Sequence, residues 1–443
     1  MTNLTIINCK VVNEGLIDEQ DILIKNGRIE KIDSLIEPIG EYIDGAGLTL
    51  LPGVIDDQVH FREPGLTEKG NIYSESRAAV AGGTTSFMDM PNVLPPTLSY
   101  GLWKEKNHIA EINSHANYSF YMGSSNTNIE EIRAIDPSEV CGVKVFMGSS
   151  TGNLLVDDPV SLENIFKDSP VLIATHCEET PMILHHEEEF KNKYGDNIPI
   201  ENHEFIRSRE ACLFSSKKAI ELAKKFNSQL HILHISTKEE LLLFTKDSIE
   251  NKQISAEVCI PHLFFSSVDY LIKGSLIKCN PSIKSESDKI ALRRALKSGL
   301  IDFVATDHAP HDIKAIDNPY FSCPSGMPSV QHTLLAVLQL VEEGDLFLED
   351  VPRVTSHNVA ARFNIKDRGY IREGYWADIV LVDIKREQVI KNKDLEYKCG
   401  WSPFTGIKFS STIIETIVNG ERAYSNGKVI DTIRGKKLEF TRG

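Results

Sequence analysis

The chain has 443 residues and a formal net charge of -15, from 48 Lys and Arg against 63 Asp and Glu. This acidic balance argues against nucleic acid or an anionic membrane as a partner, because both require clustered positive charge. No apolar run approaches the roughly 20 residues that span a bilayer, and the first residues lack the pattern of a signal peptide. We therefore expect a globular protein of the cytoplasm.

Both ends of the chain alternate apolar and polar residues. Asn-Gly pairs at 26–27, 419–420 and 426–427 each separate two such runs, which is typical of a two-residue β-hairpin. We expect residues 1–51 and 363–443 to form one small β module, a β-sandwich built from both termini.

Residues 52–362 alternate short β-rich runs with helix-like segments. The eight runs are residues 53–60, 83–90, 117–123, 142–148, 171–179, 230–236, 254–259 and 302–310. Strands and helices alternating over about 300 residues predict an α/β fold of the (β/α)8 TIM-barrel type. An open, doubly wound sheet is the alternative, although no glycine-rich nucleotide-binding motif supports it.

Five reactive side chains fall at or near the C-terminal ends of the predicted strands. They are His60, Lys144, His176, His234 and Asp307. In a barrel these ends converge on one mouth, where active sites are built. Three imidazoles and a carboxylate at that mouth favour a divalent metal site, with zinc the first choice.

Lys144 lies inside the apolar run 143–146, where an ammonium group is costly to desolvate. Burial lowers the pKa of a lysine and frees its amine to react with carbon dioxide. The carbamate formed would be an anionic ligand with two oxygens, able to bridge two metal ions. The alternative is a lysine paired with a carboxylate inside the barrel.

Seven motifs, in this order, resemble those of the class I dihydroorotases in the metal-dependent amidohydrolase superfamily. They are LPGVIDDQVHFREPG (51–65), MPN (90–92), KVFMGSSTG (144–152), ATHCEE (174–179), LHIS (233–236), NPSIK (280–284) and ATDHAPH (305–311). The resemblance covers nearly the whole chain.

The resemblance implies roles for the five side chains. His60 would ligate the more buried metal ion, and a carboxylated Lys144 would bridge two ions. His176 and His234 would hold the second ion. Asp307 would ligate the first ion and act as general base and then general acid.

One position departs from the family's Asp-x-His-x-His pattern, because Gln58 stands where its first histidine belongs. An amide oxygen is a weaker ligand for zinc than imidazole. We therefore expect one or two Zn²⁺ ions, with the first site weakened.

Arg62 offers a planar fork suited to a carboxylate. Dihydroorotate carries a carboxylate, whereas hydantoin and allantoin do not, and related hydantoinases and allantoinases typically lack this arginine. By resemblance, Asn92 and His311 would join Arg62 on the substrate, and Asn280 would contact the ring amide. For both asparagines a turn or capping role is the alternative. The Pro- and Gly-containing loop 317–332 would offer backbone groups to the substrate.

The resemblance thus implies reversible hydrolysis of (S)-dihydroorotate, a small anion, to N-carbamoyl-L-aspartate in pyrimidine biosynthesis, by metal-activated water. A hydantoinase- or allantoinase-like enzyme is the second hypothesis, encouraged by the runs KVFMGSS and CPSGMPS. The third hypothesis is a non-catalytic pseudo-dihydroorotase that serves as a scaffold, for instance for aspartate transcarbamoylase. It is suggested by Gln58, which replaces a histidine of the family pattern. The resemblance also implies a homodimer.

Overall fold

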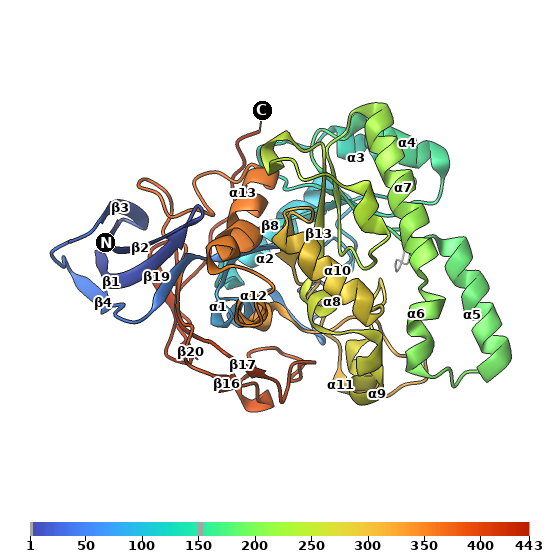
Figure 1. Cartoon of the computed structure of the whole chain (residues 1–443). Coiled ribbons are helices and arrows are strands. Elements are labelled where there is room, and N and C mark those ends of the chain that lie inside the picture. Colours follow the sequence, from blue (N-terminus) through green and yellow to red (C-terminus); the bar gives the residue numbers. More distant parts are fainter. Residues whose placement is uncertain (1–2, 149–153, 443) are drawn as a thin grey trace.

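The computed structural model describes residues 3–148 and 154–442, and Figure 1 shows its architecture. Strands from both ends of the chain gather on one side of the molecule, and the helices and the remaining strands occupy the other. Residues 149–152 of the motif KVFMGSSTG lie outside the described residues.

One nine-stranded sheet joins the two ends of the chain. Its N-terminal strands are β1 (Leu4–Asn13), β2 (Leu16–Lys25), β3 (Arg28–Asp33), β4 (Glu41–Asp44) and β5 (Thr49–Pro52). Its C-terminal strands are β15 (Ile379–Asp383), β18 (Thr412–Val418), β19 (Glu421–Ser425) and β20 (Lys428–Val429). The order is β20-β19-β18-β15-β5-β1-β2-β3, with β4 beside β1, so the antiparallel pair β5–β15 joins the termini. This confirms a sheet-rich module from both termini, while its description as a sandwich stays a prediction.

The three Asn-Gly pairs form the predicted hairpin turns, between β2 and β3, β18 and β19, and β19 and β20. At 26–27, for example, φ is 54° at the asparagine and 81° at the glycine. Positive φ at both central residues is the requirement of the type I′ turn, whose twist matches that of the flanking strands. The local sequence therefore sets the register of these hairpins.

Each of the eight predicted runs in the middle of the chain contains a strand. They are β6 (Val54–Val59), β7 (Thr84–Asp89), β8 (Asn117–Phe120) with β9 (Met122–Gly123), β10 (Val143–Phe146), β11 (Ile173–His176), β12 (Leu230–Ile232), β13 (Ile254–Cys259) and β14 (Phe303–Ala305). Their hydrogen bonds form two parallel sheets, β6-β7-β8 and β14-β13-β12-β11-β10-β9. These bonds do not form one continuous ring, so the closed barrel stays a prediction.

Helices separate the parallel strands along the chain. They are α1 (Ile72–Ala81), α2 (Tyr100–Asn113), α3 (Ile129–Arg133), α4 (Pro159–Asp168), α5 (Thr180–Tyr194), α6 (His203–Ile206), α7 (Arg209–Phe226), α8 (Ile260–Phe264), α9 (Tyr270–Lys273), α10 (Glu286–Lys297), α11 (Ile313–Ile316), α12 (Thr333–Glu342) and α13 (Asn358–Phe363). Polar caps define several ends: Ser208 accepts a hydrogen bond from the backbone of Ala211 at the start of α7. None of the helices in the described ranges is long and apolar enough to cross a membrane.

The last residues of the chain return to the parallel strands. Tyr118 N donates to Lys436 O at 3.0 Å, and Leu438 N donates to Tyr118 O at 2.8 Å. Leu438 is fully buried in an apolar cluster that also contains Met88 and Phe303. The end of the predicted β module therefore packs against β8.

Candidate active site

A cavity of about 530 Å³ lies at the C-terminal ends of the parallel strands. It is lined by all nine predicted site residues and by Gln58: His60, Arg62, Asn92, Lys144, His176, His234, Asn280, Asp307 and His311. Ser322, Pro324, Ser325 and Gly326 bring the predicted loop 317–332 to the same cavity. The structure therefore brings the whole predicted set together, while the role of each residue stays a prediction.

Three of these residues adopt a backbone conformation that is rare for residues with a side chain. The φ angle is 69° at Arg62, 41° at His234 and 50° at Asp307. The left-handed region costs about 1 kcal/mol or more for a non-glycine residue, and such conformations concentrate at functional sites. The surrounding strands and loops hold the backbone of these three residues in this conformation despite its cost.

The side chains of His176 and His234 face each other through their ring nitrogens. His176 Nδ1 lies 3.0 Å from His234 Nε2. Burial lowers the pKa of both imidazoles, that of His234 well below its usual value, so both are held in the neutral form that binds a metal ion. Zinc binds imidazole nitrogens at about 2.0–2.1 Å, and two nitrogens at the observed separation fit one such ion.

Glu178 and Arg207 orient this pair and were missed from the sequence. Glu178 Oε2 lies 2.9 Å from His176 Nε2 and accepts a hydrogen bond from Arg207 Nη1 at 2.9 Å. Burial acts to raise the pKa of Glu178, but the charge of Arg207 and the bond with His176 outweigh it and hold the pKa at about 2. The carboxylate therefore fixes the proton of His176 on Nε2 and leaves the lone pair of Nδ1 for the predicted role as a metal ligand. The first glutamate of the motif ATHCEE was the signal in the sequence that could have revealed Glu178.

His60 and Asp307 form the second pair. His60 Nε2 lies 2.9 Å from Asp307 Oδ1, while His60 Nδ1 lies 2.7 Å from Asn92 Oδ1. Asn92 thus accepts from Nδ1–H and turns the lone pair of Nε2 towards Asp307. Besides lining the cavity, Asn92 therefore orients a predicted metal ligand.

Gln58 points into the cavity but contacts Asp307 through its amide nitrogen. Gln58 Nε2 donates to Asp307 Oδ1 at 3.2 Å, and Gln58 Oε1 accepts from the Cys259 thiol at 3.5 Å. An amide NH₂ group is a donor without ligand character. In this arrangement Gln58 restrains Asp307, and the predicted first metal site would have one side-chain ligand fewer than the family pattern.

Lys144 is buried, with 1% of its surface exposed. Its Nζ lies 4.6 Å from the centre of the Phe146 ring. Burial lowers the pKa of Lys144 to about 8, so about one tenth of the amines are neutral at pH 7. A neutral amine is the form that reacts with carbon dioxide, and the residue therefore fits the predicted carbamate.

Arg62 and His311 form a buried basic pair at the mouth of the cavity. Arg62 Nη2 donates to His311 Nε2 at 3.1 Å, and Arg62 Nε donates to Pro310 O at 3.2 Å. Burial lowers the pKa of Arg62 only to about 10 and that of His311 to about 2. The pair therefore carries one positive charge, on a guanidinium whose position is fixed.

A further cluster inside the strands was not predicted from the sequence. Asp57, His231 and Glu257 are fully buried and bring one ligand atom each within 4.8 Å of the others. Burial raises the pKa of the Asp57 carboxyl to about 7 and that of Glu257 well above its usual value. The sequence feature that could have revealed this cluster is the presence of ionisable residues in the middle of apolar runs.

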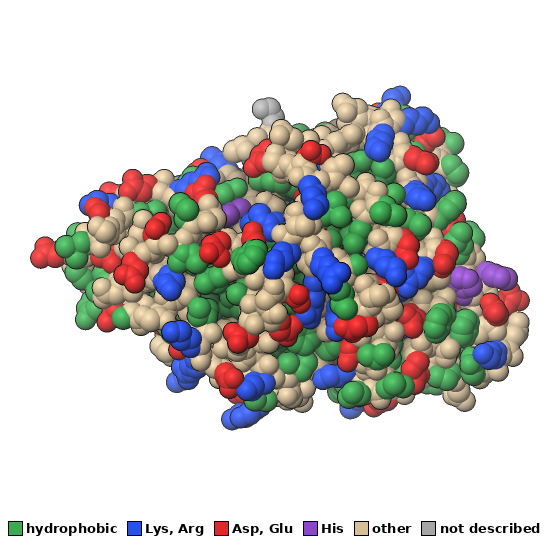
Figure 2. Space-filling model, viewed as in Figure 1, with side chains coloured by type: hydrophobic (Ala, Val, Ile, Leu, Met, Phe, Trp, Pro, Cys, Tyr) green, Lys and Arg blue, Asp and Glu red, His purple; other side chains and the backbone are tan. Residues whose placement is uncertain are grey.

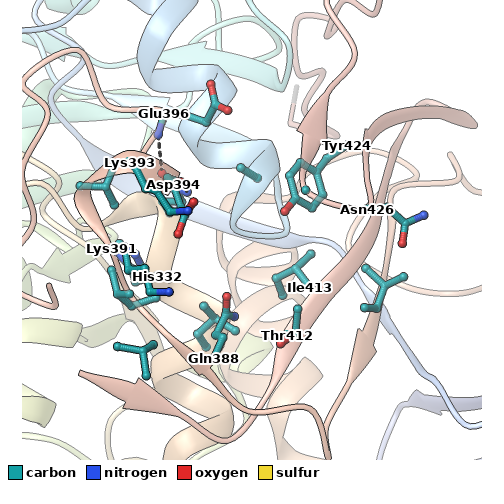
Figure 3. A pocket seen from close by; sticks show the side chains of 18 of the residues that line it. His332, Gln388, Lys391, Lys393, Asp394, Glu396, Thr412, Ile413, Tyr424 and Asn426 are labelled. Carbon is teal, nitrogen blue, oxygen red and sulfur yellow. Dashed lines mark hydrogen bonds between the residues drawn. The ribbon is translucent and has the colours of Figure 1, made fainter. Parts of the chain in front are cut away.

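A second cavity, of about 480 Å³, lies beside β18 and β19 (Figure 3). Lys391, Lys393, Asp394 and Glu396 line it from the segment that follows β16 (Gln388–Val389). None of the predicted site residues is among its described lining residues. Acidic and basic groups are interspersed there, as they are over the face of the molecule shown in Figure 2.

Residues 49–423 match the model of the amidohydrolase family. The chain belongs to the amidohydrolase family. It is 32% identical to a dihydroorotase of Methanosarcina acetivorans over 100% of this chain and 96% of that protein. It is also 32% identical to an allantoinase of Bacillus velezensis, over 94% of this chain and 93% of the relative. The solved L-hydantoinase of Arthrobacter aurescens superposes with a TM-score of 0.92 at 24% identity, covering 97% of this chain and 98% of that one.

Replacing Glu178 with Gln should weaken zinc binding by about 10- to 100-fold, because the carboxylate that orients His176 is lost. The zinc dissociation constant, measured by competition with a chromophoric chelator, tests this expectation. Glu179→Gln, at the neighbouring half-buried position, is the matched control and should bind zinc as the wild type does. Unchanged affinity in Glu178→Gln would show that this carboxylate does not support a metal ligand.

Proposed function

We propose that this chain is a dihydroorotase, which converts (S)-dihydroorotate reversibly to N-carbamoyl-L-aspartate. It is an enzyme of the metal-dependent cyclic amidohydrolase class, in keeping with its family and its dihydroorotase relatives. The observation that supports dihydroorotate as the substrate is the buried guanidinium of Arg62 beside His311. It lies in the same cavity as His176 and His234.

Arg62 would bind the substrate carboxylate. A guanidinium offers two parallel N–H donors to a carboxylate, and such charge-assisted bonds are about twice as strong as neutral ones. Arg62 Nε is bonded to Pro310 O and one Nη2 donor to His311, so the arginine is held before the substrate arrives. Asn280 lines the same cavity and would contact the ring amide.

Two positions would hold zinc. His176 and His234 would bind one ion, while His60, Asp307 and a carboxylated Lys144 would contribute to the other, with the carbamate shared between them. A zinc ion in such a site acidifies water and polarises a carbonyl group. The chain's own residues then position the substrate and carry the proton.

Asp307 would carry that proton. Its Oδ1 accepts a hydrogen bond from Gln58 Nε2 at 3.2 Å and lies 2.9 Å from His60 Nε2, so Gln58 restrains the carboxylate beside His60. The carboxylate would accept a proton from the attacking water and return it to the ring nitrogen as the amide bond breaks. Gln58 supports this step by orienting Asp307, whether or not the first metal position is filled.

An allantoinase- or hydantoinase-like activity is the second candidate, since one relative of equal identity is an allantoinase. Those ring substrates lack a carboxylate, so they would leave the buried charge of Arg62 unpaired, which is costly. A non-catalytic scaffold is the third candidate. The intact pair of His176 and His234 speaks against it, because a scaffold has no need of neutral imidazoles facing one another.

We also propose that the two parallel sheets close into one (β/α)8 barrel. In support, His60 N donates to His308 O at 2.7 Å beside β14, and β8 continues into β9 with residue 121 between them. Several sequence-based expectations remain predictions: the division into residues 1–51 with 363–443 and residues 52–362, the β-sandwich form of the module and a cytoplasmic location. A homodimer and an association with aspartate transcarbamoylase remain predictions of the resemblance.

Replacing Arg62 with Gln should lower kcat/KM for dihydroorotate by about 100-fold, because a charge-assisted pair contributes about 1.5–3 kcal/mol. Dihydrouracil is the same ring without the carboxylate, and its slower turnover should change little. Arg133→Gln, at a surface arginine, is the control and should leave both rates unchanged. An equal loss on both substrates would contradict the proposed role of Arg62.

Replacing Lys144 with Ala should remove the bridging carbamate, lower the zinc content and reduce kcat/KM by about 100-fold or more. Metal analysis and a ¹³C NMR spectrum of protein incubated with ¹³C-bicarbonate test this. The wild type should show a carbamate resonance that the variant lacks. Full metal content and full activity in Lys144→Ala would contradict the carboxylated lysine.

A further inference from the structure

A second group of ligand atoms lies inside the parallel strands, close to the candidate active site. It consists of Asp57 on β6, His231 on β12 and Glu257 on β13. His231 Nε2 lies 3.1 Å from Glu257 Oε2 and 3.5 Å from Asp57 Oδ2. These separations are close to those between two ligand atoms that share one small metal ion, since each binds at about 2.0–2.2 Å.

The two carboxyl groups of this cluster require a compensating positive charge. All three side chains are fully buried. Within the described part of the chain, the facing carboxyl group of Glu257 is the one side-chain hydrogen-bond partner of the Asp57 oxygens. A carboxylate removed from water without a compensating charge is strongly destabilised. The charge of Lys144 acts to lower the pKa of Asp57, and a bound cation or a shared proton would supply the rest of the compensation.

The orientation of His231 favours the cation. His231 Nδ1 lies 2.8 Å from Ser255 Oγ, which in turn lies 3.5 Å from Leu230 O. When the hydroxyl donates to Leu230, it accepts from Nδ1–H, and Nε2 presents its lone pair to the two carboxylates. The ring also stacks on Phe303, with 4.7 Å between centroids. A histidine that ligates a metal ion typically donates its other ring N–H to a hydrogen-bond acceptor, and Ser255 Oγ is placed to accept from Nδ1 in this way.

We propose that Asp57, His231 and Glu257 bind a divalent metal ion, separate from the ions at the cavity lined by His176 and His234. Two carboxylates neutralise the charge of such an ion, so the complex as a whole has no net charge to desolvate. One imidazole with two carboxylates suits zinc and also manganese or iron. This inference goes beyond the proposed function and does not depend on the substrate.

The ion bound by Asp57, His231 and Glu257, called the deep ion below, would also fix the position of an active-site residue. Glu257 Oε1 accepts a hydrogen bond from the backbone N–H of His234 at 3.3 Å, while Oε2 faces His231. An ion bound to Glu257 would hold this carboxylate in place and, with it, the backbone of His234. Asp57, Glu257 and His231 are therefore assigned as ligands that position the site and do not touch the substrate.

Metal stoichiometry tests the proposal. Purified protein is reconstituted with zinc, freed of loosely bound metal and analysed by mass spectrometry. Asp57→Asn and Glu257→Gln keep the side-chain size, and each should hold about one zinc equivalent less than the wild type. Glu240→Gln, at a buried carboxylate bonded to Ser216 and Thr237, is the control and should keep the wild-type content.

His234→Asn separates this site from the proposed active site. It should lose an equivalent of zinc that Asp57→Asn retains, and the double variant should lose both. The zinc count is independent of turnover, so an inactive protein that holds the deep ion would contradict only the proposed function.

Anomalous diffraction at the zinc edge from wild-type crystals gives the decisive result even if a variant fails to fold. A peak between Asp57, His231 and Glu257 is expected. Anomalous density confined to the cavity, with equal zinc content in the wild type and both carboxylate variants, would overturn the proposal and leave a proton shared between the two carboxyl groups.

Discussion

Desolvation of ionisable side chains inside the parallel strands is the constraint on which the site depends. Burial lowers the pKa of Lys144 to about 8 and keeps His234 neutral, while Arg62 remains charged despite its burial. Each of these states is the one its predicted role requires: an amine that can react, an imidazole that can bind metal and a cation that can bind a carboxylate. Buried carboxylates such as Glu178 persist because a cation lies beside them.

The sequence predicted the members of the site better than the contacts between them. Side chains at the ends of parallel strands meet at one edge, and this rule was enough to assemble the set around the cavity. Glu178 and Arg207 were missed because they act through His176, and no spacing rule connects residues 29 positions apart. Asp57, His231 and Glu257 were missed because they lie within strands β6, β12 and β13 and not beyond their C-terminal ends, to which this rule applies.

The fold was predictable where local chemistry decides it. The Asn-Gly turns fix their hairpins because both residues must adopt positive φ. By contrast, β12 is shorter than the predicted run 230–236, because it ends at Ile232 and His234 adopts the left-handed region. The return of Leu438 to Tyr118 was not predictable, since it joins segments more than 300 residues apart through backbone hydrogen bonds. Closure of the two parallel sheets into one barrel likewise depends on contacts between segments far apart in the sequence.

The central claim is that a metal-dependent site selects a cyclic amide that bears a carboxylate. The most direct measurement is the ratio of kcat/KM for (S)-dihydroorotate to that for allantoin, determined with the zinc-loaded wild-type protein. The account predicts a ratio of at least about 100, because the carboxylate that pairs with Arg62 is present in only one of the two substrates. A ratio near or below one would contradict it.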